Sequence, residues 1–271
     1  MLNYKAPLAL FENKSILVTG ASQGIGQQVA YAYAEHGARV ILHGRQTAEL
    51  EKLANRITAA GYLAPQILTQ DLQSTEIADY QALAAAIAAE HSCLDGVLLN
   101  AGLLGAITSL METSLTVWQQ VQQVNVTANL LLLQALAPLL LASAEASVIF
   151  TSSGVGRHGR AGWGSYAVSK FATEGLMQVL ADEWSTTTIR VNAINPGATR
   201  TGMRASARPE EDPLTLPTPA DLMPLYLWLM GHDARHIRGQ SLDAQPKVST
   251  PARHCPEIYT CQAMTAALTR K

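Results

Sequence analysis

The stretch Thr19-Gly20-Ala21-Ser22-Gln23-Gly24-Ile25-Gly26 indicates the fold of this chain more strongly than any other part of its sequence. It follows a short apolar run over residues 15–18, and a helical pattern continues from it over residues 25–35. Glycines let the backbone approach a pyrophosphate closely, and the free N–H groups at a helix start bind its negative charge. The order of strand, turn and helix therefore favours a dinucleotide site over a turn that is merely rich in glycine.

The alternation of strand and helix continues along the chain. Apolar segments typical of strands lie at residues 40–42, 66–69, 96–99, 147–150, 189–194 and 240–243. Helical segments lie between them, at residues 47–60, 75–90, 115–141, 166–184 and 219–230. Strands that are apolar throughout and alternate with helices form parallel sheets covered on both faces. We therefore expect an α/β fold with a doubly wound parallel sheet, a Rossmann fold of three α/β/α layers.

Neither an internal repeat nor a low-complexity linker divides the chain. We expect residues 1–245 to form a single nucleotide-binding domain that also contains the catalytic site. Residues 198–219 are rich in proline and lack apolar periodicity, so they are predicted to form a long loop beside the substrate. Residues 246–271 have no clear pattern and are predicted to be a tail, which could be an ordered arm, a flexible end or an extension without a role.

The composition excludes several classes of protein. Hydrophobic residues make up 48% of the chain and charged residues 15%, the opposite of the balance in a disordered protein. A formal net charge of −2 gives no basic excess for nucleic acid. The most apolar stretch, residues 130–141, is shorter than the roughly 18 residues of a membrane span, and the N-terminus has no secretory pattern. We expect a cytoplasmic protein without a membrane segment.

The cysteines predict neither a disulfide framework nor a metal site. The chain has 3 cysteines, too few and too unevenly spaced for a framework. His254, Cys255 and Cys261 lie near one another in the tail, but a fourth ligand and a paired CxxC motif are missing. We predict no metal.

The end of the second strand bears on the choice of dinucleotide. It reads His43-Gly44-Arg45, where a site for NAD usually has an Asp or Glu that binds the ribose 2′-hydroxyl. An arginine at this point can pair with a 2′-phosphate through two hydrogen bonds. NADP(H) is therefore preferred and NAD(H) stays possible, the alternative being that Arg45 is a solvated residue at a helix start.

Ser153, Tyr166 and Lys170 form a candidate catalytic set. Tyr166 and Lys170 lie one turn apart on a predicted helix and so share a face. A free tyrosine, with a pKa of about 10, is a poor acid–base catalyst at neutral pH. A nearby ammonium would lower that pKa, and the hydroxyl of Ser153, directly after a strand, can donate to a developing oxyanion. Residues of these types elsewhere in a protein are usually core or surface residues.

At this point the sequence resembles a known family, the short-chain dehydrogenase/reductases, in their compact single-domain branch. The resemblance extends over residues 14–243, and residues 156–175 and 218–231 resemble one bacterial group within the family. Its motifs are TGASQGIG at 19–26, Asn100-Ala101-Gly102, Asn125, Ser153, Tyr166 with Lys170, and Asn195-Pro196-Gly197.

The resemblance implies a role for each matching residue. Tyr166 would be the general acid in carbonyl reduction and the base in alcohol oxidation. Lys170 would lower the pKa of Tyr166 and hold the nicotinamide ribose, Ser153 would polarise the substrate oxygen, and Asn125 would hold a water of the proton relay. Asp71 would meet the adenine amino group. The implied cofactor-binding residues are Thr19, Gly20, Ser22, Gly24, Ile25, Gly26, Arg45, Asp71, Leu72, Asn100, Ala101, Gly102, Tyr166, Lys170, Pro196, Gly197, Thr199 and Thr201.

Two departures from the family pattern concern the cofactor and the assembly. Ser22 and Gln23 stand in the glycine-rich turn, where members that use NADP commonly have a basic residue. The last strand ends Leu242-Asp243-Ala244-Gln245-Pro246 in place of the usual Val-Asp-Gly-Gly. Because that usual end packs between subunits, a homotetramer becomes less expected than a homodimer formed by the long helices.

Several arginines flank the expected mouth of the site. Arg157, His158 and Arg160 precede Tyr166, and Arg200, Arg204 and Arg208 follow the Pro-Gly turn. They favour an anionic substrate or carrier, and the competing interpretation is that they are solvated or pair with neighbours such as Glu210, Glu211 and Asp212. Trp163, Trp228 and the methionines of residues 223–230 are interpreted as core residues rather than pocket walls.

Together these patterns predict an NADP(H)-dependent oxidoreductase that interconverts a small-molecule carbonyl and a secondary alcohol. The alternative from another class is a scaffold that senses a dinucleotide without turning it over. A scaffold has no need of both Tyr166 and Lys170, so the intact set of four favours the enzyme. The loops that select a substrate carry the least pattern, and the sequence does not name the substrate.

Overall fold

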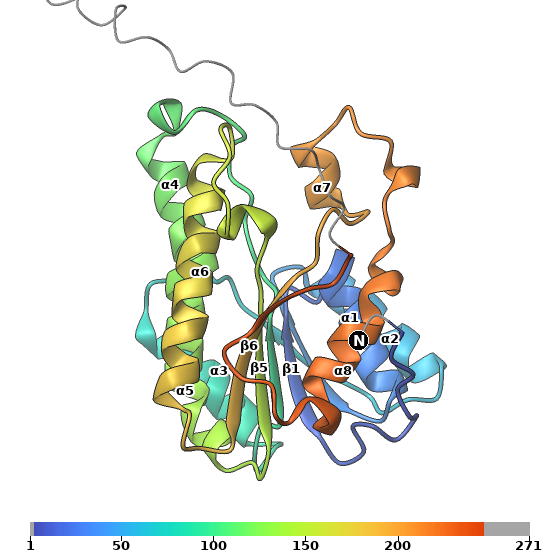
Figure 1. The fold of residues 1–271 in the computed structure, drawn as a ribbon. Coiled ribbons are helices and arrows are strands. Elements are labelled where there is room, and N and C mark those ends of the chain that lie inside the picture. The colour runs from blue at the N-terminus through green and yellow to red at the C-terminus, as the bar shows by residue number, and fades with distance from the viewer. Residues whose placement is uncertain (1–2, 247–271) are drawn as a thin grey trace, which may run out of the picture.

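Parallel strands form the centre of the molecule (Figure 1). The structure, a computed structural model, describes residues 3–246. Its 7-stranded sheet has the order β3-β2-β1-β4-β5-β6-β7, so the strand order reverses between β1 and β4. In such sheets ligands bind at the carboxyl ends of the strands beside that reversal. The strands are β1 (Ser15–Thr19), β2 (Arg39–Gly44), β3 (Gln66–Thr69), β4 (Gly96–Leu99), β5 (Ala146–Thr151), β6 (Ile189–Asn195) and β7 (Ser241–Asp243).

Helices cover both faces of the sheet, which confirms the predicted three-layer Rossmann fold. In Figure 1, α3, α4, α5 and α6 lie on one side and α1, α2 and α8 on the other. The α-helices are α1 (Gly24–Glu35), α2 (Thr47–Ala59), α3 (Ile77–Ala88), α4 (Leu115–Gln122), α5 (Ala128–Leu141), α6 (Gly164–Glu183), α7 (Gly202–Ala207) and α8 (Met223–Met230). A π turn, η2 (Gln123–Thr127), joins α4 to α5, and the 3₁₀ turns are η1 (Leu110–Glu112), η3 (Gly154–Gly156), η4 (Pro213–Thr215), η5 (Pro219–Leu222) and η6 (His232–Ala234).

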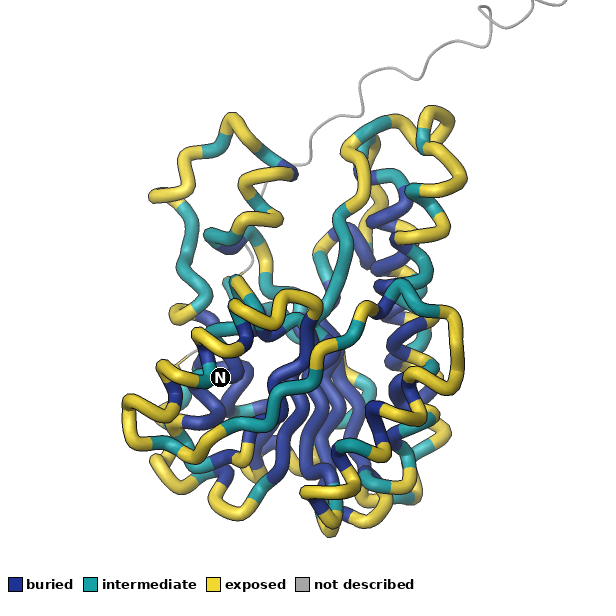
Figure 2. Tube along the Cα trace, turned by 180° about the vertical axis from the view of Figure 1, so that it is seen from behind, coloured by how far each residue is buried: buried dark blue, intermediate teal, exposed yellow. Residues whose placement is uncertain are grey.

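The two faces of the sheet belong to two separate apolar cores. Every residue of β1 is buried, and Figure 2 shows the strands as the dark blue centre of the molecule. Successive side chains of a strand point to opposite faces. Leu17 accordingly packs with α3, α5 and α6, whereas Val18 packs with α1, α2 and α8. Burial on both faces explains why the strands are apolar throughout rather than alternating.

Residues 115–141 are helical as predicted, but the helix is not regular. The π turn η2 interrupts it and places Asn125 inside the protein. Leu115–Leu141 is long and apolar enough to cross a membrane by length and composition, with 44% of its most apolar window buried. In the structure its buried leucines pack on the sheet within the same core as α3 and α6. The apolar stretch of residues 130–141 is thus only the C-terminal part of a longer apolar segment, Leu115–Leu141, so its length alone does not decide whether a span is possible.

Residues 198–219 are more ordered than the predicted long loop. They contain α7, whose first turn is capped by the hydroxyl of Thr201, and the turn η4. The predicted helix of residues 219–230 begins as the 3₁₀ turn η5, where Asp221 accepts 2.7 Å hydrogen bonds from the amide and the hydroxyl of Thr218. The expected tail, apart from Pro246, lies outside the described residues.

Candidate active site

The glycine-rich turn between β1 and α1 has the shape that a pyrophosphate needs. Gly20 has a φ of +66°, a conformation that favours glycine. A Cβ atom on Gly26 would lie 2.3 Å from the Gly20 carbonyl oxygen and 2.5 Å from Nδ2 of Asn100. No acidic residue lies in the first turn of α1, and Gln23 gives it no side-chain cap. The backbone N–H groups of that turn can therefore bind an anion, so the residues present fit a dinucleotide.

Thr19 fixes the segment of residues 100–102 beside this turn. Its Oγ1 accepts hydrogen bonds from the amides of Asn100 (2.9 Å) and Ala101 (3.1 Å) and donates to the carbonyl of Leu98 (3.2 Å). Asn100 in turn donates from Nδ2 to the carbonyls of Thr19 (3.2 Å) and Gly20 (3.4 Å). Thr19 is fully buried and does not line the cavity, so the structure places it behind the predicted cofactor contacts.

One cavity of about 300 Å³ lies at the carboxyl ends of the strands, beside the reversal of strand order. It brings together most of the predicted site residues. Three predicted residues, Thr19, Gly26 and Asn125, lie behind its wall. The predicted residues that line it are Gly20, Ser22, Gly24, Ile25, Arg45, Asp71, Leu72, Asn100, Ala101, Gly102, Ser153, Tyr166, Lys170, Pro196, Gly197, Thr199 and Thr201.

Arg45 lies at the end of the cavity near β2 and β3. Its Nη1 is 3.8 Å from Oδ2 of Asp71, and both side chains are about half exposed (53% and 50%). A pair so exposed is weak, which leaves the guanidinium able to bind a second anion. His43 also lines this end, is buried, and has no hydrogen-bond partner for either ring nitrogen within residues 3–246. Burial lowers the pKa of His43 to about 4, so its ring is neutral at physiological pH.

Tyr166 and Ser153 meet where α6 begins beside the end of β5. Ser153 caps η3 by accepting a 3.4 Å hydrogen bond from the amide of Val155. Burial raises the pKa of Tyr166 to about 12, and a hydrogen bond with Ser153 opposes that rise. Burial thus outweighs the hydrogen bond of Ser153 in this arrangement, and the lowering of this pKa by Lys170 stays a prediction. The phenol is therefore held in its protonated form.

Lys170 is directed to the end of β5 rather than to the phenol oxygen. Its Nζ donates a 2.7 Å hydrogen bond to the carbonyl of Thr151 and lies 5.6 Å from the centre of the Tyr166 ring. Burial lowers the pKa of Lys170 to about 8, and the negative charge of Glu174 works in the opposite direction. Lys170 is thus mostly charged at neutral pH, and it loses its proton at a pH only slightly higher.

Asn125 lies in the π turn and holds the segment after Gly102. Its Oδ1 accepts from the amide of Leu103 at 2.7 Å, and its Nδ2 donates to the carbonyl of Leu103 and the hydroxyl of Ser169, both at 2.9 Å. The carbonyl of Asn125 accepts from Asn129 at 2.8 Å. The side chain expected to hold a water is therefore bonded within the protein. The sequence does not indicate these hydrogen bonds, because they depend on the π turn that directs Asn125 into the protein. Such turns are frequent at functional sites.

The far end of the cavity, beyond Tyr166, is apolar. Leu104, Trp163, Met203 and Ala207 line it. Trp163 is buried in an apolar cluster with Tyr166 and Ala207, which agrees with its interpretation as a core residue, and it also forms a wall of this cavity. Sequence reasoning missed this end because a single aromatic or methionine carries no pattern that distinguishes a pocket wall from a core. The remaining lining residues that it did not select are Gln23, His43, Gly44, Gln46, Gln70, Leu103, Val124, Thr151, Ser152 and Gly202, and the predicted mouth residue Arg204 also lines the cavity.

Three of the predicted mouth arginines are bound to other groups of the protein. Arg157 donates to Asp243 at 2.6 Å. Arg200 donates to the carbonyl of Pro213 at 2.7 Å, and Arg204 donates to Glu211 from two nitrogens at 2.5 and 2.7 Å. The interpretation that the arginines pair with neighbouring acids is therefore correct for Arg204, whose partner is Glu211, whereas Arg157 and Arg200 bind groups that the sequence did not indicate.

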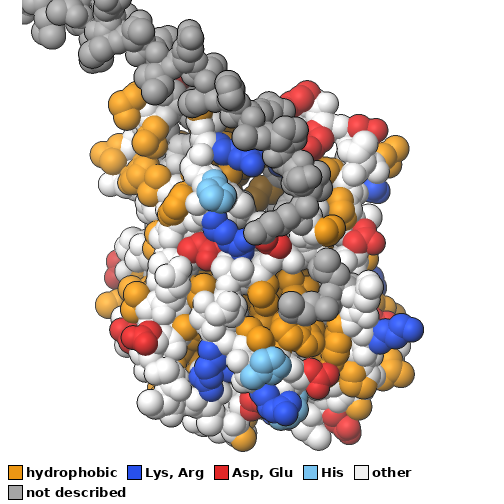
Figure 3. All heavy atoms as spheres, in the orientation of Figure 1, with side chains coloured by type: hydrophobic (Ala, Val, Ile, Leu, Met, Phe, Trp, Pro, Cys, Tyr) orange, Lys and Arg blue, Asp and Glu red, His pale blue; other side chains and the backbone are white. Residues whose placement is uncertain are grey.

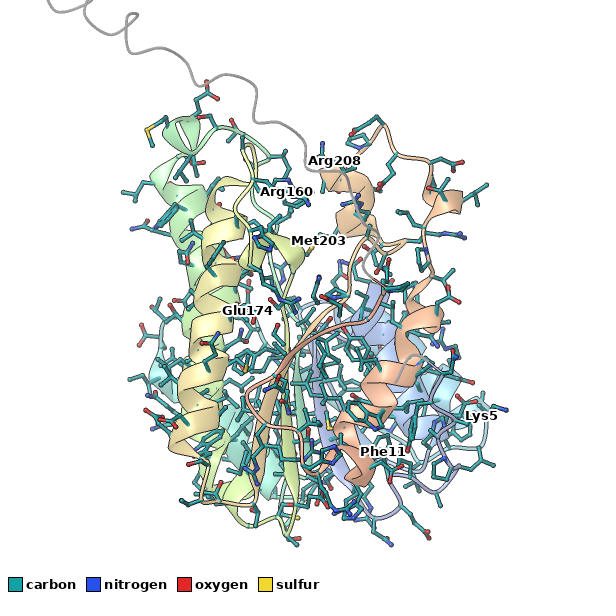
Figure 4. The ribbon with its side chains drawn as sticks, in the orientation of Figure 1. Lys5, Phe11, Arg160, Glu174, Met203 and Arg208 are labelled. Carbon is teal, nitrogen blue, oxygen red and sulfur yellow. The ribbon has the colours of Figure 1, made fainter. Side chains whose placement is uncertain are left out.

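Two arginines remain beside the mouth. Figure 4 shows Arg160 and Arg208 from its two sides, above Met203. Arg208 lies 5.7 Å from the centre of the Trp163 ring and makes only a 3.6 Å contact with the exposed Glu210. Within residues 3–246, the side chain of Arg160 makes no salt bridge. Apolar side chains gather over α4 and the segment before it in Figure 3; the exposed ones there are Ile107, Leu110, Met111 and Leu115.

A doubly wound parallel sheet with a dinucleotide cradle and a Ser-Tyr-Lys set at one edge defines the short-chain dehydrogenase/reductases, and the chain belongs to this family of oxidoreductases. It matches the short chain dehydrogenase family over residues 14–212. It is 54% identical over 245 residues to the oxidoreductase YciK of Escherichia coli strain K12, covering 90% of this chain and 97% of that one. The bacterial group that the sequence resembles is thus that of YciK.

Two solved structures are similar throughout. A short chain dehydrogenase of Escherichia coli CFT073, complexed with NADPH, is 55% identical with a TM-score of 0.87 and covers 89% of this chain and 100% of its own. A short chain dehydrogenase of Shigella flexneri 2a, complexed with NADP, is 54% identical with a TM-score of 0.87 over the same shares.

Proposed function

We propose that the chain is an NADP(H)-dependent oxidoreductase that interconverts a carbonyl and a secondary alcohol. One observation carries this proposal: a single cavity extends from the glycine-rich turn and Arg45 to Ser153, Tyr166 and Lys170. The NADP and NADPH complexes of the two similar proteins support the choice of cofactor. NAD(H) stays possible as a weaker ligand, since the ribose contacts of the two cofactors differ only at the 2′ position.

The nicotinamide, when bound, supplies or accepts the hydride. Tyr166 donates a proton to the carbonyl oxygen in reduction and accepts it back in oxidation. The hydroxyl of Ser153 donates a hydrogen bond to the same oxygen and so stabilises the charge that develops on it. Lys170, held by Thr151, provides a positive charge next to the phenol. Asn125 positions the segment of residues 102–103 that closes this part of the site.

We further propose that the substrate has an apolar body and an anionic end. Trp163, Met203 and Leu104 offer an apolar wall beyond Tyr166. Arg160 and Arg208 at the mouth can pair with a carboxylate or phosphate that projects from that wall. Arg157, Arg200 and Arg204 are left out of this proposal because each is bound to another group of the protein.

The test is oxidation of NADPH with matched pairs of ketones, each pair differing only in a carboxylate remote from the carbonyl. We expect turnover, and a lower KM for the carboxylate member. The double variant Arg160→Gln/Arg208→Gln should raise KM for that member only, whereas Arg235→Gln, at an exposed arginine directly after η6, should change neither KM. Equal KM values within each pair would contradict the proposal that the substrate has an anionic end. Absence of turnover with every ketone would contradict the proposed oxidoreductase activity and favour a dinucleotide-sensing scaffold.

We also propose a cytoplasmic homodimer. Exposed apolar side chains on α5 and α6 support an interface of two copies: Leu130, Leu141, Val168, Phe171 and Val179. The departure at the end of β7 makes a tetramer less favoured. Sedimentation velocity should give the mass of a dimer, and a monomer at micromolar concentration would contradict this assembly.

A further inference from the structure

A buried carboxylate, Glu174, lies one helical turn beyond Lys170 on α6 and has no part in the reaction described above. Its side chain is only 8% exposed. It accepts hydrogen bonds from the hydroxyl of Ser152, from the hydroxyl of Ser241 at 2.7 Å and from Nε of Arg157 at 3.4 Å. A buried charge is tolerated only where it is paired and hydrogen-bonded. Figure 4 shows Glu174 partway along α6, below the mouth.

The network continues from Glu174 to the end of β6. Arg157 donates to Oδ1 of Asp243 at 2.6 Å, and the same oxygen accepts from Nδ2 of Asn195 at 2.9 Å. Oδ1 of Asn195 accepts from the amide of Gly197 at 3.1 Å, and Gly197 lines the cavity. Hydrogen bonds therefore connect the helix of Tyr166 and Lys170, the residue before Ser153, and the turn at Gly197.

Charged groups of three elements surround Glu174 and Lys170. Glu174 lies one turn from Lys170 on α6 and pairs with Arg157 on the loop after β5, and Arg157 pairs in turn with Asp243 on β7. Tyr166 is the other titratable group beside it. The π turn packed against α6 contributes Asn125, which has no charge. Glu174 is the acid that acts on Lys170 directly, since its charge opposes the lowering of the Lys170 pKa by burial.

We propose that Glu174 is a positioning residue that keeps Lys170 charged and ties the segments carrying Ser153, Lys170 and Gly197 to one another. The proposal rests on the proposed function for its kinetic consequence, but not for the charge of Lys170 itself. Removal of a negative charge near an ammonium favours its neutral form. A purely structural carboxylate would change stability without moving the titration of Lys170.

The experiment measures two properties of Glu174→Gln, which keeps the shape and removes the charge. The first is the rate at which acetic anhydride labels Lys170 as a function of pH, read by mass spectrometry without substrate. The second is the pH profile of kcat/KM for ketone reduction. We expect both midpoints to fall, by about half a pH unit or more. Glu183→Gln, an exposed glutamate at the end of the same helix, should move neither.

A second variant, expected to shift the labelling midpoint in the opposite direction, distinguishes an electrostatic effect from a loss of structure. Arg157→Gln removes the cation beside Glu174, so the labelling midpoint of Lys170 should rise instead of fall. Opposite shifts in the two variants would support the proposal. Labelling midpoints of Glu174→Gln and Arg157→Gln that equal the wild-type value would overturn it. If no ketone were reduced, the labelling arm would still decide the role of Glu174, while the proposed function would fail separately.

Discussion

The ammonium of Lys170 lies 2.7 Å from the backbone carbonyl of Thr151, at the end of the strand that leads into Ser153. This bond fixes the charge of Lys170 relative to the strand rather than relative to the phenol of Tyr166. Because Thr151 and Ser153 lie on the same segment, this bond also fixes the position of the Lys170 ammonium relative to the hydroxyl of Ser153. The catalytic set is therefore organised around the carboxyl end of β5.

The pH dependence of ketone reduction follows from two pKa values. Reduction needs a protonated Tyr166 and a charged Lys170. Burial raises the pKa of Tyr166 to about 12, so the phenol stays protonated, and burial lowers that of Lys170 to about 8. We expect kcat/KM to be level near neutral pH and to fall as pH rises through about 8. A rate that increases through this range would show that another group controls the reaction.

Arg45→Ala should remove most of the preference for NADPH over NADH. Hydrogen bonds to charged groups contribute about 1.5–3 kcal/mol, which corresponds to about a 10- to 150-fold change in affinity. Binding of both cofactors can be followed by nicotinamide fluorescence. Arg39→Ala is the matched control, since this exposed arginine lies at the opposite end of the same strand. The role of Arg45 would be refuted by an unchanged ratio of the two dissociation constants.

Gly26→Ala should destabilise the protein and weaken cofactor binding together. The added Cβ would meet the Gly20 carbonyl oxygen at 2.3 Å, and overpacking costs about 1–3 kcal/mol in the free energy of unfolding. Gly175→Ala provides the comparison, because a Cβ at this position on α6 meets no atom within 4 Å. Removal of a glycine from a helix should raise stability by about 0.5–1 kcal/mol. Urea denaturation of both variants measures the difference, and equal stabilities would contradict the close packing.

Much of the fold was predictable because its signals are local. The glycine-rich turn, the apolar strands and the one-turn spacing of Tyr166 and Lys170 each depend on neighbouring residues. The π turn at Asn125 was not predictable, since the apolar pattern of residues 115–141 runs through it without a break. Helix α7 was not predictable either, because its 6 residues are too few to show a periodic pattern.

The electrostatics of the site could not be predicted from spacing alone. The pairs Arg157–Asp243 and Glu174–Ser241 join segments that are far apart in the sequence. The sequence predicts that Arg157 lies at the mouth of the site, whereas in the structure it lies between α6 and β7 and pairs with the buried Glu174. The pKa of Tyr166 likewise depends on burial, which spacing on a helix does not reveal.

The reduction of a ketone by NADPH in wild type and in Tyr166→Phe tests the account most directly. The variant lacks only the hydroxyl that donates the proton, so we expect turnover to fall by about 10²- to 10⁴-fold. Its affinity for NADPH, measured by nicotinamide fluorescence, should stay close to that of the wild type. A Tyr166→Phe variant that oxidises NADPH at a rate near that of the wild type would contradict the assignment of Tyr166 as the general acid.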